Sequence, residues 1–158
     1  MKRLILFLLA ISFALSCTAC AGTEEDHPSF YYLRTEDTIA YGKEDALIAP
    51  VAQEFSENIQ PDQVWQLYFS GPGKEGYRSP FPRGTGLQGL TQKENLLILE
   101  LSPEFSELDG IRLTLAGACL AATCRELTGM ERIQVRSGSQ IYDFYYHDFT
   151  FLDNSTGK

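Results

Sequence analysis

The order of segments along the 158-residue chain predicts an α+β fold, a two-layer sandwich in which two helices cover one face of a mixed sheet. Two segments with helical spacing of apolar residues lie among several runs rich in aromatic and branched aliphatic residues. No internal repeat or heptad pattern is present. The expected order is strand, strand, helix, strand, strand, helix, strand, strand, a βαββαβ-type arrangement with extra strands.

The first strand is expected at residues 30–33, a Phe-Tyr-Tyr-Leu run followed by a charged turn. Residues 46–55 form a second extended segment, where Pro50 indicates an edge position or a bulge because proline cannot donate to a ladder. The first helix is expected to begin at Pro61 and to stop at residues 70–72, Ser-Gly-Pro. Its apolar residues are Val64, Trp65, Leu67, Tyr68 and Phe69.

A long loop, two strands and the main helix are expected in the middle of the chain. Residues 71–86 are rich in glycine and proline and predict a loop. Strands are expected at 87–90 and 96–101. The main helix lies between Ser106 and Leu127 and should be the most buried element, because few polar residues interrupt it. Thr128-Gly129 closes it. Its apolar stripe contains Ile111, Leu115, Cys119 and Ala122.

Two further extended segments follow the main helix. Residues 132–136 alternate between polar and apolar side chains, which is typical of a half-buried strand. Residues 137–139, Ser-Gly-Ser, predict a hairpin turn. The strongly aromatic residues 141–151 are expected to continue as extended chain.

The N-terminus has the pattern of an export signal. Two basic residues precede an apolar run that is shorter than the ~20 residues of a membrane-spanning helix. Thr-Ala stands directly before Cys20, which predicts cleavage after residue 19 and attachment of lipid to the Cys20 thiol. Cys17 is the alternative acceptor. An ordinary secretory signal or an uncleaved anchor are the other possibilities, and each places the folded part outside the cytoplasm.

The predicted organisation is a signal peptide at 1–19, an acidic tether at 20–29, one domain at 30–152 and a flexible tail at 153–158. Without the signal peptide, 11 basic residues remain against 21 acidic ones, a net charge of −10. Such a polyanion is not expected to bind nucleic acid, whose phosphates require lysine and arginine. We expect a location at the extracytoplasmic face of the cell membrane.

The remaining cysteines, Cys119 and Cys124, are expected to be small buried side chains. On one helix, five residues place them on different faces with Cα atoms more than ~7 Å apart, which a disulfide does not span.

The titratable residues do not form a catalytic constellation. His27 lies in the expected tether, and His147 with Asp143 and Asp153 gives only a weak metal motif, since no second histidine or thiolate is placed to help. No nucleophile elbow or phosphate loop is present. The sequence therefore predicts no catalytic residue, no metal and no cofactor, and hence a protein that is not an enzyme.

The aromatic density of residues 141–151 is the strongest candidate for a binding surface. Alternation along a strand places some rings on each face, and one set is expected in the core. An exposed set is a candidate for docking a protein or glycan, because aromatic rings dominate interface energetics. The candidate partner-binding residues are Tyr142, Tyr145, Tyr146 and Phe149.

Several landmarks together resemble the GerMN domain of sporulation and spore-germination proteins and of lipoproteins in spore-forming Gram-positive bacteria. They are the strand at 30–33, the helix running into Gly71-Pro72, the turn at 82–85, the strand end at 97–105 and the segment 123–135. The resemblance covers roughly residues 30–140. It departs from the pattern at Trp65, Tyr68 and Phe69 in the first helix, at Cys124, and in the presence of a single copy. It implies a compact envelope domain that binds or assembles and has no enzymatic activity.

Two hypotheses for function follow. The first is a lipid-anchored module that binds or assembles with envelope, sporulation or germination proteins, including self-association. The alternative is a solute- or glycan-binding envelope lipoprotein that uses the aromatic segment 141–151.

Overall fold

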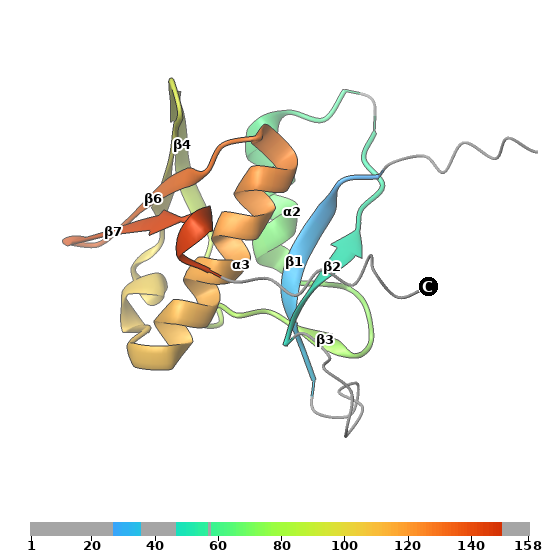
Figure 1. Cartoon of the computed structure of the whole chain (residues 1–158), viewed down its shortest axis with the longest axis horizontal. Helices are drawn as coiled ribbons and strands as arrows, with labels where there is room; N and C mark the ends of the chain where they lie inside the picture. Colours follow the sequence, from blue (N-terminus) through green and yellow to red (C-terminus); the bar gives the residue numbers. More distant parts are fainter. Residues whose placement is uncertain (1–26, 36–46, 57, 150–158) are drawn as a thin grey trace, which may run out of the picture.

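The computed structural model describes residues 27–35, 47–56 and 58–149 and has the predicted α+β fold. Figure 1 shows the two helices in the middle of the molecule, with one sheet on each side of them. The helices are α2 (Pro61–Ser70) and α3 (Gly110–Thr128), and two short 3-10 turns are η2 (Pro103–Glu107) and η3 (Tyr146–Asp148).

Four strands form the mixed sheet that the sequence predicts. They are β4 (Leu87–Lys93), β5 (Leu96–Leu101), β6 (Arg132–Ser137) and β7 (Gln140–Tyr145), in the order β4-β5-β6-β7. The parallel pair β5–β6 is joined through α3, and the two outer pairs are antiparallel. Leu97, Leu99 and Leu101 of β5 are all buried, as the alternation predicts.

The first strands form a second sheet, which is an addition to the predicted single mixed sheet. Its strands are β1 (Ser29–Arg34), β2 (Ile48–Ala52) and the short β3 (Tyr77–Arg78), in the antiparallel order β2-β1-β3. Pro50 lies on the edge strand β2, opposite Tyr31, which confirms the edge position.

Side chains of the helices, in place of a strand, cover the inner edge of β1. The Tyr31 amide donates to Thr123 Oγ1 of α3 at 3.0 Å, and the Tyr68 hydroxyl of α2 donates to the Tyr31 carbonyl at 3.1 Å. The Tyr32 hydroxyl in turn donates to the Tyr68 carbonyl at 2.8 Å. Because buried peptide groups need partners, these bonds stabilise β1 against the helices and explain why it stands apart from the mixed sheet.

The core lies between the helices and both sheets. Residues 116–124 of α3 are all buried, so this helix is the most buried one, as predicted. Its first turn differs from the prediction: Ile111 is 75% exposed, because the stripe of buried residues starts only at Ala116. On α2, Trp65 and Tyr68 are buried, whereas Leu67 is 46% exposed. Cys119 and Cys124 are buried free thiols, as expected.

Candidate functional site

The aromatic C-terminal segment is not extended throughout, which corrects the prediction for residues 141–151. Strand β7 ends at Tyr145, and η3 follows. The Tyr146 amide makes the last ladder bond, to the Glu131 carbonyl at 2.8 Å, and the Phe149 amide then donates to the Tyr146 carbonyl at 3.2 Å. The chain therefore turns where the predicted strand was to continue, and residues 150–151 lie outside the described residues.

The four candidate aromatic residues do not form one surface. Tyr142 points to the core side of the sheet, where its ring is 5.5 Å from that of Phe105. Tyr145 lies on the opposite face, since it is an odd number of residues away on the same strand. Tyr146 and Phe149 belong to η3 and the residue after it, and both are half-buried.

Tyr145 belongs to a small polar cluster on the outer face of the mixed sheet. It pairs with Arg132 across the β6–β7 ladder, and the Arg132 guanidinium carbon is 5.4 Å from the centre of its ring. Arg132 Nη2 donates to Asp143 Oδ1 at 3.0 Å, a bond that raises the pKa of the guanidinium. Asp143 also accepts from Gln134 at 3.3 Å. The Nε atom of Arg132 is buried and forms no hydrogen bond with any described residue.

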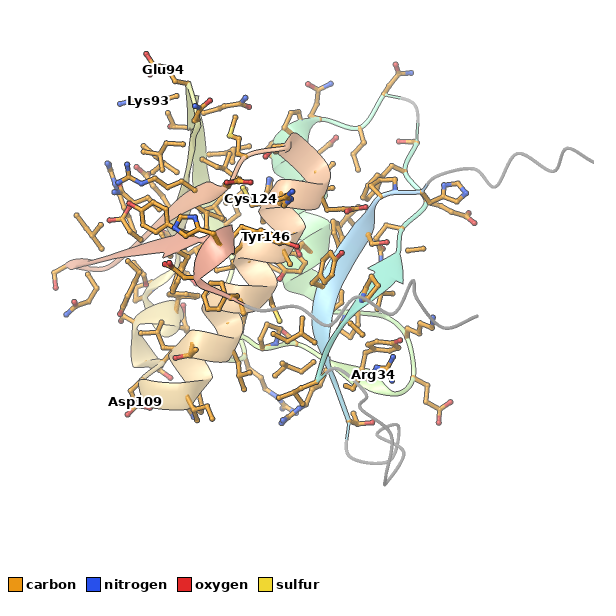
Figure 2. All side chains as sticks on the ribbon, in the orientation of Figure 1. Arg34, Lys93, Glu94, Asp109, Cys124 and Tyr146 are labelled. Carbon is orange, nitrogen blue, oxygen red and sulfur yellow. The ribbon has the colours of Figure 1, made fainter. Side chains whose placement is uncertain are left out.

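Tyr146 connects η3 to the C-terminal end of α3. The Arg125 guanidinium lies 4.3 Å from the centre of the Tyr146 ring, and Arg125 Nη1 bonds Glu131 Oε1 at 2.7 Å. Figure 2 shows Tyr146 beside α3. A cation over an aromatic ring is attractive even at partly exposed sites, so this contact fixes the end of β7 against the helix.

Within the described residues, the outer edge of β7 is an open strand edge. The peptide groups of an antiparallel strand point alternately toward its neighbour and away from it. The Tyr146 amide points toward β6, where it bonds Glu131, so the peptide groups of Ile141, Asp143 and Tyr145 point away from the sheet. No described residue bonds these outward groups. The Ile141 side chain is also 61% exposed.

The other strand edges are protected. Pro50 interrupts the donor row of β2, and β3 has only two residues. Helix α2 contacts β4, and a bulge interrupts β4 between Leu87 and Gly89. Proteins commonly block edges in these ways to prevent unwanted strand pairing. The β7 edge has neither proline nor bulge in the described structure, so it is the edge most available to a partner strand.

An open cavity of about 1170 Å³ lies at the end of the mixed sheet, next to the β7 edge. It is formed by the β4–β5 turn, the loop after α3 and the start of η3. Figure 2 shows Lys93 and Glu94 at the tip of that turn. The residues that line the cavity include charged residues, one aromatic residue and one histidine: Lys93, Glu94, Glu131, Arg132, Tyr145 and His147. The lining of mixed charge around a half-buried ring is suited to a polar ligand, such as a peptide or a sugar.

The residues considered for metal binding do not come together. Asp143 of β7 bonds Arg132 of β6, whereas His147 lies on η3, where its imidazole is 3.4 Å from Asp148. Asp153 lies outside the described residues. Within residues 27–35, 47–56 and 58–149, no group of three histidine, cysteine or acidic side chains could hold a metal ion.

The predicted lipid acceptor Cys20 and its alternative Cys17 lie outside the described residues, as do the signal peptide at 1–19 and the tail at 153–158. Arg132, Ile141 and the turn at Lys93-Glu94 are surface features that were not predicted from the sequence. The alternating pattern of residues 132–136 carried a signal for Arg132, because its polar positions had to face solvent.

Fold and surface together define a small α+β domain with a strand edge that is open in the described structure and a cavity of mixed charge. The chain belongs to the Germane family, described as "Sporulation and spore germination", whose model matches residues 29–141. This confirms the resemblance found in the sequence. A comparison with curated protein sequences gives no match.

Two solved structures are similar to the chain. One is the first GerMN domain of the sporulation protein GerM from Bacillus subtilis, with 13% sequence identity, a TM-score of 0.46, and coverage of 60% of this chain and 74% of that one. The other is a "Putative Lipoprotein from Clostridium perfringens", with 19% identity, a TM-score of 0.42, and coverage of 76% of this chain and 87% of that one. None of the helices in the described part of the chain has the length and apolar character that crossing a bilayer requires.

Proposed function

We propose that this protein is a lipid-anchored, extracytoplasmic binding and assembly module of the Germane family, attached to the cell membrane through Cys20. Its partners are envelope, sporulation or germination proteins, and it has no enzymatic activity. The open edge of β7 is the observation that carries the proposal, because Ile141, Asp143 and Tyr145 offer an extended segment a row of peptide groups that no described residue pairs. Sporulation and germination as the setting follow from the family.

The candidate residues take different roles in this proposal. Tyr145 lies on the β7 edge itself and contributes a half-buried ring to the contact. Tyr146 and Phe149 hold the end of the strand in place, and Tyr142 supports it from the core side. The domain boundaries proposed from the sequence, 20–29 for the tether and 30–152 for the domain, place this edge beyond a short acidic linker.

The test is cross-linking and recovery of partners from membranes. Ile141→Pro removes an outward amide hydrogen without removing a β6–β7 ladder bond, in the way that Pro50 is accommodated opposite Tyr31. We expect Ile141→Pro to lose the partner that wild type recovers and the control Ile141→Thr to keep it. The Cys20→Ala protein should lose membrane attachment through lipid. Recovery of no protein partner by wild type under mild conditions would contradict the proposal.

A second candidate function is solute or glycan binding, which the cavity beside Tyr145 favours. The Tyr145 ring lies beside Arg132, and Lys93 lines the same cavity, so a sugar could stack on the ring while an anionic group meets a cation. A true ligand stabilises the fold by mass action, so thermal unfolding in the presence of cell-wall fragments tests this function. A rise in the unfolding temperature that Tyr145→Ala abolishes would favour it over protein assembly.

A further inference from the structure

A groove with a largely apolar lining lies between the start of α2 and the end of α3. Its volume is about 500 Å³, within the range of small-molecule sites. Seven of its ten lining residues are apolar or proline: Pro28, Phe55, Ile59, Pro61, Val64, Trp65 and Leu127. The other three are Gln92, Glu126 and Thr128.

The chemistry of the lining selects for a neutral, apolar ligand. No lysine, arginine or histidine is among the described residues that line the groove, and Glu126 carries the one acidic group. An anionic headgroup or a free fatty-acid carboxylate would therefore meet no cation and would be repelled by Glu126. A hydrocarbon chain whose carboxyl group is esterified carries no charge and fits the lining.

The position of Pro28 connects the groove to the N-terminal segment. Pro28 lines the groove and directly precedes β1. Pro28 is eight positions after Cys20, and eight extended residues span at most about 26–29 Å. A lipid on Cys20 is therefore within reach of the groove of its own molecule. Tethering also gives it a high effective concentration there, which a free lipid lacks.

We propose that the groove between α2 and α3 binds one acyl chain of the lipid attached to Cys20 of the same molecule. The inference rests on the lipid attachment in the proposed function. A chain bound in this way is withdrawn from the bilayer, so the remaining chains alone anchor the protein, and the N-terminal side of the domain is held toward the membrane.

Trp65 provides the measurement, because it lines the groove and is the single tryptophan of the chain. Bromine on an acyl chain quenches tryptophan fluorescence only at close contact. The probe is methyl 9,10-dibromostearate, an uncharged ester, added to wild type and to Cys20→Ala in phosphatidylcholine vesicles. We expect several-fold stronger quenching in Cys20→Ala, whose groove has no attached chain, than in wild type, whose groove is already filled.

A second arm distinguishes the source of the chain. Wild type is placed in vesicles whose phosphatidylcholine is brominated in its acyl chains. An attached chain carries no bromine, so we expect Trp65 to remain unquenched. Quenching by the brominated vesicles would show that a membrane lipid enters the groove and would overturn the proposal. Equal quenching of wild type and Cys20→Ala by the added ester would overturn it as well.

Matched variants on α2 locate the bound ester. Val64 lines the groove, whereas Leu67 on the same helix is exposed and does not. In the Cys20→Ala background, Val64→Gln should abolish quenching by the ester and Leu67→Gln should preserve it. Leu127→Gln, on α3, repeats the test if Val64→Gln fails to fold. Absence of quenching in Cys20→Ala itself would overturn the groove as an acyl-chain site.

Mass spectrometry of the N-terminal peptide separates this inference from the proposed function. An unmodified Cys20 would overturn both the proposed function and this inference. The mass of the peptide, and not the fluorescence, identifies that outcome. A lipidated Cys20 together with a groove that the dibromostearate ester still enters would overturn this inference alone. Cys17→Ala is the control, because it leaves the proposed acceptor in place and should behave as wild type in both arms.

Discussion

Gly117 of α3 lies directly against the ring of Phe144 of β7. A Cβ atom built on Gly117 would be 2.3 Å from Cε1 and 2.4 Å from Cδ1 of that ring, closer than Cβ contacts in proteins. The Phe144 ring is also stacked parallel to that of Tyr142, with centroids 6.4 Å apart. The helix and the edge strand therefore approach at a distance that glycine permits and a larger residue does not.

Gly117→Ala should lower the free energy of unfolding by about 1–3 kcal/mol, since overpacking forces the ring or the helix to shift. The loss is expected although alanine favours a helix over glycine by about 1 kcal/mol. Chemical denaturation measures it. In the Phe144→Ala background the same substitution should cost nothing or stabilise the protein, and an equal loss in both backgrounds would contradict the contact.

Thr123→Val should destabilise the protein by about 1–3 kcal/mol, because it leaves the Tyr31 amide without its acceptor on α3. Valine has nearly the same shape, so packing is preserved. Thr123→Ser keeps the hydroxyl and is the control, with a smaller expected loss. If the two variants lose equal stability in denaturant titrations, the hydrogen bond is not the cause.

Stability should fall at alkaline pH. Burial raises the pKa of the Tyr32 and Tyr68 hydroxyls, whereas in the unfolded chain both titrate near 10. Above about pH 10 the unfolded state loses tyrosine protons that the folded state retains, so the contribution of these two hydroxyls to stability is full below that pH and decreases above it, by at most about 1.4 kcal/mol per pH unit for each group. Urea unfolding between pH 8 and 11 measures the slope.

Tyr68→Phe provides the control for the pH dependence. It removes one of the two titrating hydroxyls together with its bond to the Tyr31 carbonyl. The variant should be less stable at neutral pH and should show a shallower alkaline slope. An unchanged slope would exclude Tyr68 as a source of the pH dependence.

Glu94→Gly should raise the free energy of unfolding by about 0.5–1 kcal/mol. Glu94 has a φ of 44° at the β4–β5 turn, in the left-handed region where a side chain costs about 1–2 kcal/mol. Glycine removes that strain, although part of the gain is offset by the flexibility of glycine in the unfolded chain. Glu94→Ala retains the Cβ and should give no gain, which separates strain from charge in thermal unfolding.

Cys119 and Cys124 should not react with a maleimide in the native protein. Both thiols are buried, and burial raises the pKa of each, so little thiolate is present at neutral pH. Both should be labelled in urea. Labelling of either thiol before unfolding, or a mass two units lower than that of the dithiol, would contradict their role as packing residues.

Much of the fold could be predicted because its signals are local. Alternation identified β5 and β6, proline and glycine marked both ends of α2, and Pro50 indicated an edge. The predictions that were wrong concern which side chains of a helix are buried and where a strand ends. Ile111 fits the helical spacing but lies before the buried part of α3, and β7 stops at Tyr145 because the chain turns into η3.

The candidate surface was only partly predictable. The aromatic density drew attention to β7, but spacing could not show that Tyr142 faces the core while Tyr145 lies beside Arg132. The open edge depends on which peptide groups face β6, and the cavity depends on three loops that are distant in the sequence. Neither property is encoded in any short segment.

Residue type and local spacing were enough to establish most of the elements, the export signal pattern, the strong negative charge and the family resemblance. Three-dimensional packing was needed to show that β1 joins a second sheet, that Gly117 meets Phe144 and that no described residue pairs with the outer edge of β7. These outcomes depend on contacts between residues far apart in the chain. There the packing of whole elements selects one arrangement among several that satisfy the same local preferences.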